Sequence, residues 1–194
     1  MRHFIQLSCL CLLGSGFMIG CQSLHSQHSY QKKVKIHAVS TQGIGQKIGT
    51  VRLEDSAQGL VITVHLSKLP SGEHGFHIHE NGSCQAAERN GKLGAAYAAG
   101  NHFNPDHAKY HGTVLTGHLG DLPALQVDSN GNVNQSIIAP RLKLSDIQGL
   151  AIIVNAGEDN YADTAILSSR GSEHIACGDR KSTRLNSSHS RAPR

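Results

Sequence analysis

The feature that most constrains the fold of this chain is a concentration of metal-ligand side chains in its middle. The side chains between Gly75 and Asp121 that we single out as candidate metal ligands are five histidines and one aspartate: His77, His79, His102, His111, His118 and Asp121. His77 and His79 are separated by one residue, so on a β-strand they point to the same face and can bind one metal ion together. The segments around the later histidines are rich in Gly and Pro and predict loops. We therefore expect a loop that folds over a strand pair to gather six ligands; chance clustering among 14 histidines is the alternative.

The remainder of the central region predicts β-structure. Short apolar runs rich in β-branched residues occur at residues 34–39, 48–53, 60–66 and 149–154. Turn sequences at residues 55–59 and 128–132 interrupt the pattern. The chain shows no internal repeat and no long helical period, so this pattern predicts an all-β domain, either an antiparallel sandwich or a barrel. A mature part of about 150 residues is the size of one domain.

The N-terminus is interpreted as a bacterial export signal of the lipoprotein type. Residues 4–20 are largely apolar after a positive start at Arg2, but the run is too short and too interrupted by Gly and Ser for a transmembrane helix. Met18-Ile19-Gly20-Cys21 resembles a lipobox, so residues 1–20 predict a signal peptide and Cys21 a lipidated residue. An ordinary secretory signal with an incidental cysteine is the alternative. Residues 22–33 are polar and predict a flexible tether.

The C-terminal residues 179–194 are interpreted as non-native, because they read like the translation of a sequencing-library adapter. A natural basic tail is the alternative. This segment holds five Lys/Arg and one Asp, and it accounts for the whole net charge of +4. Residues 21–178 hold 12 Lys/Arg against 13 Asp/Glu. The basic composition of the chain therefore gives no indication of nucleic acid binding.

The central region resembles the bacterial copper–zinc superoxide dismutases. The matching strings are residues 75–80 (Gly-Phe-His-Ile-His-Glu), 82–84, 99–105, 117–125, 139–143, 159–163 and 176–178. Their order and spacing hold over about residues 34–178. The resemblance implies a Greek-key antiparallel β-sandwich or barrel, immunoglobulin-like, with long metal-site loops. Cys84 and Cys177 remain after the signal and Cys21 are removed, so they predict one disulfide, which in the family ties the metal-site loop to the last strand.

The resemblance also implies two metal ions in each chain. The zinc ligands would be His102, His111, His118 and Asp121, a set suited to closed tetrahedral coordination. The copper ligands would be His77, His79, His102 and the residue at position 155. His102 would be shared by both metals, and Asp159 would orient one histidine of each. His107 offers an alternative register to His111.

Two positions depart from the family pattern, and both belong to the copper side. Asn155 stands where the family has the fourth copper-ligand histidine, and a neutral amide is a poor copper ligand. His174 stands where the family has an arginine that attracts and positions superoxide at the catalytic centre. An unperturbed histidine is mostly uncharged at neutral pH, so it replaces that arginine poorly.

The resemblance implies a superoxide dismutase of the bacterial cell envelope that converts two superoxide ions and two protons into O₂ and H₂O₂, weakened by the two departures. We expect a periplasmic protein anchored by lipid to a membrane, the outer one by preference. The alternatives are a non-catalytic homologue stabilised by zinc, a module that binds or delivers copper, and sequence errors at Asn155 and His174. The sequence does not distinguish a monomer from a homodimer.

Overall fold

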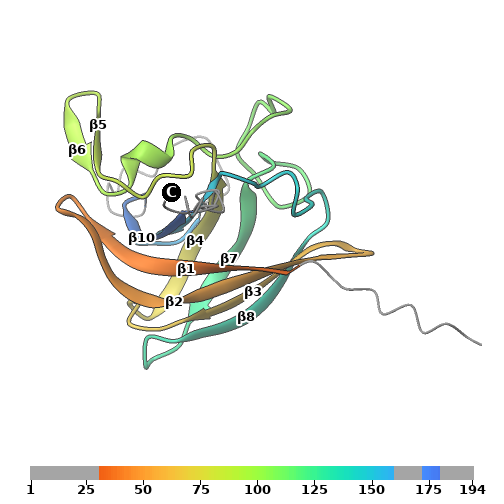
Figure 1. Cartoon of the computed structure of the whole chain (residues 1–194), viewed down its shortest axis with the longest axis horizontal. Coiled ribbons are helices and arrows are strands. Elements are labelled where there is room, and N and C mark those ends of the chain that lie inside the picture. Colours follow the sequence, from red (N-terminus) through yellow and green to blue (C-terminus); the bar gives the residue numbers. More distant parts are fainter. Residues whose placement is uncertain (1–30, 160–171, 180–194) are drawn as a thin grey trace, which may run out of the picture.

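The computed structural model describes residues 31–159 and 172–179, and these residues form β-strands and one 3₁₀ turn without an α-helix (Figure 1). The elements are β1 Gln31–Ser40, β2 Gly43–Ser56, β3 Gly59–Leu66, β4 Gly72–His79, β5 Ala87–Arg89, β6 Lys92–Gly94, η1 Tyr97–Ala99, β7 Asp121–Val127, β8 Val133–Ala139, β9 Ala151–Asn155 and β10 His174–Asp179. The all-β prediction is confirmed. No helix in these ranges has the length and apolar character needed to span a membrane. The signal peptide, Cys21 and residues 22–30 lie outside the described residues.

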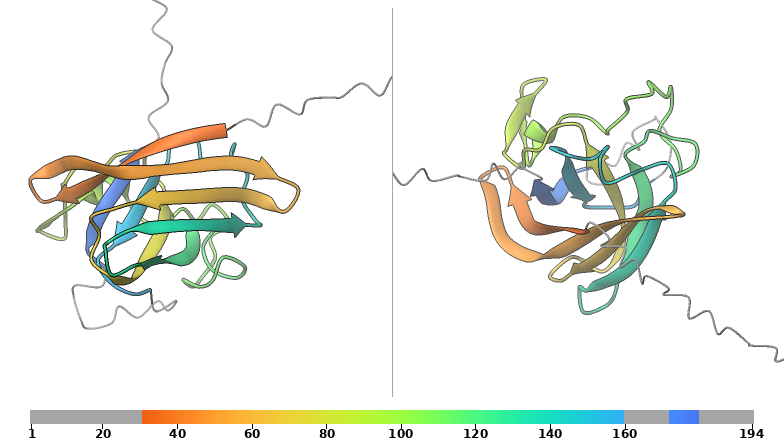
Figure 2. Two further views of the ribbon diagram at one scale, coloured as in Figure 1. Left: turned by 90° about the horizontal axis from the view of Figure 1, so that it is seen from below. Right: turned by 45° about the vertical axis from the view of Figure 1, so that its right-hand side comes forward.

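Eight strands form one antiparallel sheet in the order β7-β4-β9-β10-β1-β2-β3-β8. The sheet curls into a nearly closed barrel, in which β1, β2, β3 and β8 form one half and β4, β7, β9 and β10 the other (Figure 2). The chain passes from one half to the other at β3–β4, β7–β8 and β8–β9, consistent with a Greek key. The two edge strands, β7 and β8, approach each other where the barrel nearly closes. There the Gln135 side chain of β8 donates to the Ala124 carbonyl and accepts from the Gln126 N–H of β7, at 3.1 Å each.

The strand boundaries correct two of the limits expected from the sequence. Residues 34–39, 48–53 and 60–66 do lie in β1, β2 and β3. However, β1 already begins at Gln31, because residues 31–33 pair with residues 52–54 of β2. Asp179, which was assigned to the tail, is the last residue of β10 and pairs with Ala151. Residues 31–33 and Asp179 therefore belong to the folded domain, and residues 22–30 and 180–194 lie outside the described residues.

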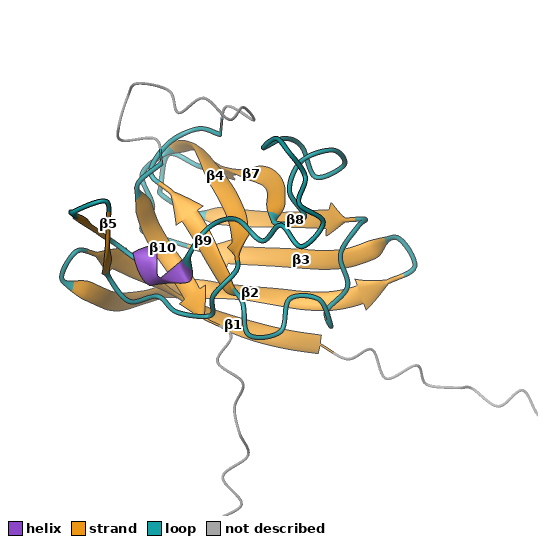
Figure 3. Ribbon diagram, turned by 90° about the horizontal axis from the view of Figure 1, so that it is seen from above, coloured by secondary structure: helices purple, strands orange, loops and turns teal. Residues whose placement is uncertain are grey.

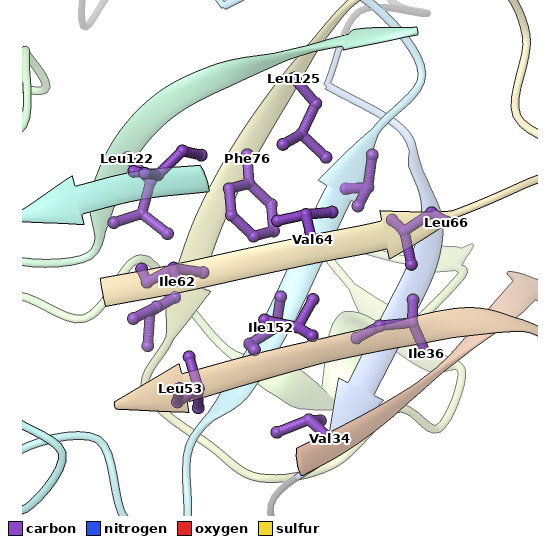
Figure 4. Close-up of a cluster of buried hydrophobic side chains, with 14 of the residues drawn as sticks. Val34, Ile36, Leu53, Ile62, Val64, Leu66, Phe76, Leu122, Leu125 and Ile152 are labelled. Carbon is purple, nitrogen blue, oxygen red and sulfur yellow. The ribbon is translucent and has the colours of Figure 1, made fainter. Parts of the chain in front are cut away.

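Alternate residues of the eight barrel strands point into the barrel and form its core (Figure 4). The side chains shown there include Val34, Ile36, Leu53, Ile62, Val64, Leu66, Phe76, Leu122, Leu125 and Ile152. On β4, Phe76 and Ile78 belong to this core and are 0% and 1% exposed. The intervening His77 and His79 must therefore point away from the core. The strand period thus places both histidines on the outer face of the barrel wall.

The long connection between β4 and β7 covers this outer face (Figure 3). A second, smaller apolar cluster lies between the loop and the wall: Cys84, Ala96, Ala99, Ala151, Ile153 and Cys177. The predicted disulfide is confirmed, since Cys84 in the loop is bonded to Cys177 of β10 with a Cα–Cα distance of 5.7 Å and a sequence separation of 93. The bridge fixes the start of the metal-site loop to the last described strand.

We expect Cys177→Ser to lower the free energy of unfolding by about 2–5 kcal/mol, the usual effect of removing a native bridge that closes a long loop. Truncation after Asp179 should change it by less than about 0.5 kcal/mol, because a polar tail of this composition buries little apolar surface. Urea unfolding of the two variants and of Cys84→Ser/Cys177→Ser measures both effects. If truncation destabilises the protein more than loss of the bridge does, the stabilising role of the disulfide and the interpretation of the C-terminal tail are both wrong.

Candidate metal centre

His77 and His79 are held in fixed orientations by hydrogen bonds from one ring nitrogen each. Nε2 of His77 donates to Asp159 Oδ2 at 2.6 Å, and Nδ1 of His79 donates to the Gly100 carbonyl at 3.0 Å. The other nitrogens, His77 Nδ1 and His79 Nε2, are buried and have no hydrogen-bond partner among the described residues. Two buried nitrogens oriented this way match the donor set of a metal ion.

Burial also keeps both imidazoles uncharged. It lowers the pKa of His77 to about 4, even though the hydrogen bond to Asp159 acts in the opposite direction. Burial, reinforced by the neighbouring histidines, lowers the pKa of His79 well below its ordinary value. At neutral pH both rings therefore carry a lone pair rather than a second proton, which is the form that binds metals.

A second group of side chains converges on one oxygen of Asp121, whose carboxylate is fully buried at the start of β7. Oδ1 lies 2.9 Å from Nδ1 of both His102 and His111, and 3.6 Å from Nδ1 of His118. The other oxygen, Oδ2, accepts the backbone N–H groups of Gly112 and His118 at 2.9 and 2.8 Å. Three imidazole nitrogens and one carboxylate oxygen thus meet around a single point, which suits a tetrahedral zinc ion.

The charges of this group differ from those of His77 and His79. Burial opposes protonation of His111, but hydrogen bonds to Asp121 and Asp159 outweigh burial and raise the pKa of His111 to about 10. The same contacts hold the pKa of Asp121 well below its usual value, although burial alone would raise it. The metal-free group is therefore a carboxylate paired with an imidazolium, and a bound cation would replace that proton.

His102 and Asp159 join the two groups. The His102 ring stacks on His77 with centroids 4.1 Å apart, while its Nδ1 faces Asp121, so Nε2 lies on the opposite edge of the ring. Asp159 accepts from Nε2 of His77 at 2.6 Å and from Nε2 of His111 at 2.7 Å. The compact set of ligand atoms within 4.8 Å of one another contains His77, His102, His111 and Asp121. The set includes His77, whose ring stacks on His102. His118 is not in the set, but its Nδ1 faces the same oxygen of Asp121. We therefore place His118 with His102, His111 and Asp121 and call these four residues the Asp121 group.

Two further placements bear on the sequence expectations. The structure brings His111 to Asp121, whereas His107 is exposed and lies in a left-handed turn with φ of 52°. Arg141 is a residue whose role the sequence analysis missed. Its Nε donates to Val114 O at 2.8 Å, and its Nη2 donates to the carbonyls of Gly117 and His118 at 2.9 and 3.0 Å. Arg141 therefore fixes the loop segment that carries His118, and the Ala-Pro-Arg string was the available signal.

The two departures from the family pattern face each other. Asn155 at the end of β9 and His174 at the start of β10 are Cα partners in the ladder. The Asn155 side chain lies beside His77, because a Cβ built at Gly75 would be 3.0 Å from His77 Cε1 and 3.3 Å from Asn155 Nδ2. Oδ1 of Asn155 is buried without a hydrogen-bond partner among the described residues. This amide oxygen is therefore a neutral and weak metal ligand. It lies in the part of the barrel wall that carries His77, His79, Asn155 and His174, which we call the copper-side wall.

His174 is largely buried in the same wall. Its Nδ1 donates to the Ala95 carbonyl at 3.0 Å, and its ring meets His79 edge-on with centroids 5.0 Å apart. Burial, assisted by the charge of Arg89, lowers the pKa of His174 to about 4. The sequence led us to expect an ordinary histidine that titrates near neutrality, whereas the lowered pKa keeps this imidazole uncharged at neutral pH.

Comparisons with known proteins agree with this geometry. A family model for copper/zinc superoxide dismutase (SODC) matches residues 47–179. The copper–zinc superoxide dismutase of Escherichia coli (strain K12) is 46% identical over 149 residues, which cover 76% of this chain and 86% of that protein. Among solved structures, the Brucella abortus enzyme has a TM-score of 0.74 at 37% identity, and the monomeric Salmonella enterica enzyme has 0.69 at 44%; each match covers 78% of this chain and 100% of the other. The chain therefore belongs to the copper–zinc superoxide dismutase family, whose members are oxidoreductases that bind copper and zinc.

Proposed function

We propose that this chain catalyses the dismutation of superoxide at a copper site formed by His77, His79 and His102, with Asn155 as a weak fourth donor. Bound copper supplies one-electron redox chemistry, by which one superoxide is oxidised to O₂ and a second is reduced to H₂O₂ with two protons. The observation that carries the proposal is the pair of buried, uncharged rings of His77 and His79, each with one nitrogen that has no hydrogen-bond partner among the described residues.

The protein's own residues would contribute orientation and proton handling. Asp159 and the Gly100 carbonyl select which nitrogen of His77 and of His79 is available to a metal. His102, placed between the two groups, would offer one ring nitrogen to each metal, and its Nε2 would be available to hold a proton. His102, His111, His118 and Asp121 would hold zinc in a structural role.

A non-catalytic homologue stabilised by zinc is the second candidate. It is favoured by one observation: both departures lie at paired positions of the copper-side wall, while the Asp121 group and the disulfide are complete. A module that only binds or delivers copper would use the same three histidines. These candidates differ from the first in turnover, so the rate per bound copper separates them.

The test is the dismutation rate of protein loaded with zinc and copper, divided by the measured copper content. Zinc-only protein gives the blank. We expect turnover above this blank, but below the diffusional ceiling of about 10⁸–10⁹ M⁻¹s⁻¹, because the fourth donor is weak. A copper-loaded protein that does not exceed the blank would exclude the dismutase assignment and leave the second candidate.

We further propose an envelope location, with the mature protein in the periplasm and Cys21 lipidated for attachment to the outer membrane. The support is the lipobox-like Met18-Ile19-Gly20-Cys21 sequence. The substitution Cys21→Ser is expected to move the protein from the membrane fraction to the soluble fraction, because no acyl chain can then be attached. Cell fractionation with Cys9→Ser as the control measures this. A Cys21→Ser variant that stays in the membrane as fully as the unchanged chain would contradict the anchor.

A further inference from the structure

The imidazole that β9 lacks at position 155 has a counterpart on the neighbouring strand. His77 of β4 pairs with Ile153 of β9, so the period of β9 puts Asn155, two residues further on, on the same outer face of the barrel wall. His174 of β10 is the Cα partner of Asn155 in the next ladder. Cross-strand partners present their side chains on one face of a sheet. The copper-side wall therefore holds an amide and an imidazole at paired positions.

A register shift in β10 turns His174 to this outer face. Cys177 lies in the apolar cluster outside the barrel, so strict alternation would place Ile175 on the outer face and His174 on the core side. The ladder between β9 and β10 shifts register between His174 and Ala176, and Ile175 packs against the barrel core instead. Shifts of this kind re-aim side chains beside functional sites. Here the shift places the imidazole on the face that carries the β4 histidines.

The His174 ring lies at a ligand-like distance from the candidate copper ligands. Two imidazoles whose nitrogens each lie about 2 Å from one ion have ring centroids about 4–6.4 Å apart, for angles at the ion of about 80–180°. The centroids of His174 and His79 are 5.0 Å apart, and those of His102 and His79 are 4.9 Å apart. The centroids of His77 and His79 are 6.3 Å apart. His174 thus lies as close to His79 as His102 does.

The hydrogen bond of His174 leaves one ring nitrogen in the form that binds a metal. Its Nδ1 donates to the Ala95 carbonyl at 3.0 Å, so the lone pair of this tautomer is on Nε2, at the other edge of the ring. The Tyr97 ring packs edge-on against it, with centroids 5.6 Å apart. His79 is held in the same manner, since its Nδ1 donates to the Gly100 carbonyl. A hydrogen bond from one nitrogen that orients the ring for a metal at the other is the usual arrangement around ligand histidines.

We propose that His174 is a further copper ligand of this chain, through Nε2, and that β10 supplies in this way the imidazole missing at position 155 of β9. The proposal rests on the copper site proposed above and extends it from three histidines to four. His174 lessens the loss of copper affinity caused by Asn155 without removing it, because the Ala95 carbonyl fixes the ring in a position set by the loop and not by the metal.

The test compares the Cu(II) affinity of His174→Asn with that of the unchanged chain, by competition with a chelator in protein whose Asp121 group already holds zinc. The amide of an asparagine can donate to the Ala95 carbonyl in place of Nδ1 but offers no ring nitrogen, so the structural contact is kept and the donor is lost. We expect the affinity to fall at least about tenfold. His65→Asn is the matched control, because His65 is an exposed histidine of β3 whose Nδ1 bonds to Asn134 Oδ1. Equal affinities for the two variants would overturn the proposal.

Pulsed EPR of the Cu(II) protein counts the coupled imidazoles of the unchanged chain, without relying on a substitution. We expect four, and one fewer in His174→Asn; three in the unchanged chain would contradict His174 as a ligand. In an Asn155→His background, His174→Asn should lower the affinity less than about threefold, because the two rings compete for one place on the ion. An equal loss in both backgrounds would mean that His174 acts only through the fold, and would also overturn the proposal.

Neither measurement depends on turnover. If the loss of affinity and the imidazole count are as expected but copper-loaded protein does not exceed the zinc-only blank, the proposed dismutase function fails while the assignment of His174 stands.

Discussion

Replacing Asn155 with histidine is expected to raise the copper affinity of this protein by at least about 100-fold. The substitution adds a nitrogen donor to His77, His79 and His102 at a buried position where the present amide oxygen has no hydrogen-bond partner among the described residues. Loss of a residue that merely orients a ligand typically costs about 10–100-fold in metal affinity, so restoring a direct donor should gain at least as much. Gly75, which has no side chain, leaves space beside position 155.

Competition with a copper chelator, followed by metal analysis and the Cu(II) spectrum, measures this gain. Asn130→His, in the exposed turn between β7 and β8, controls for an added surface histidine. Asn155→Ala shows whether the amide contributes to binding at all, and we expect only a small further loss. An Asn155→His protein that binds copper no better than Asn130→His would mean that position 155 does not face the metal.

Removing zinc is expected to lower the free energy of unfolding by about 4 kcal/mol when the free zinc concentration had been about 1,000 times its dissociation constant. Asp121→Ala should abolish this zinc-dependent increment, because Oδ1 of Asp121 is the point on which three histidines converge. The control is Asp128→Ala, since Asp128 also accepts two backbone N–H groups in a turn but lies at the other end of β7. Thermal unfolding with and without a chelator gives the increment for each protein.

This zinc-dependent increment should shrink as the pH falls. In the metal-free protein the contacts of His111 with Asp121 and Asp159 raise its pKa to about 10. These contacts therefore stabilise the folded protein fully below the unfolded pKa of about 6.5, and their contribution is lost as the pH rises through about 10. Zinc must displace that proton, so its affinity falls by about tenfold for each unit of pH below 10 per proton released. Zinc content that is substoichiometric and unchanged in Asp121→Ala would contradict the site.

Local patterns predicted the parts of this structure that depend on chain periodicity. The apolar runs at residues 34–39 and 60–66 became strands because their alternate residues pack in one core. His77 and His79 share the outer face for the same reason. The choice of His111 over His107, and the ligand group as a set, came from the family resemblance, since a loop of Gly, Pro and polar residues has no period from which a contact can be deduced.

The parts that the sequence did not predict depend on tertiary surroundings. The pKa of His174 follows from burial between Tyr97 and His79, which no local pattern indicates. Arg141 reaches three carbonyls of a loop that precedes it by more than 20 residues. Arg89 reaches the Tyr97 ring only because the β5–β6 hairpin folds back on it. Apart from the Ala-Pro-Arg string at Arg141, such long-range contacts carry no local sequence signature at the positions that make them.

The single carboxylate of Asp159, bonded to His77 and to His111, has a thermodynamic consequence for how the two metals load. A metal ion bound at His77 or at His111 selects the tautomer of that ring whose Nε2 donates to Asp159. This hydrogen bond fixes the Asp159 carboxylate in the position from which it also accepts from the second histidine. The two binding equilibria are therefore linked, and by reciprocity any factor by which zinc tightens copper binding must equal the factor by which copper tightens zinc binding. At copper concentrations that do not saturate the site, a chain whose copper affinity is reduced at Asn155 would therefore also gain less of this coupling for its own zinc.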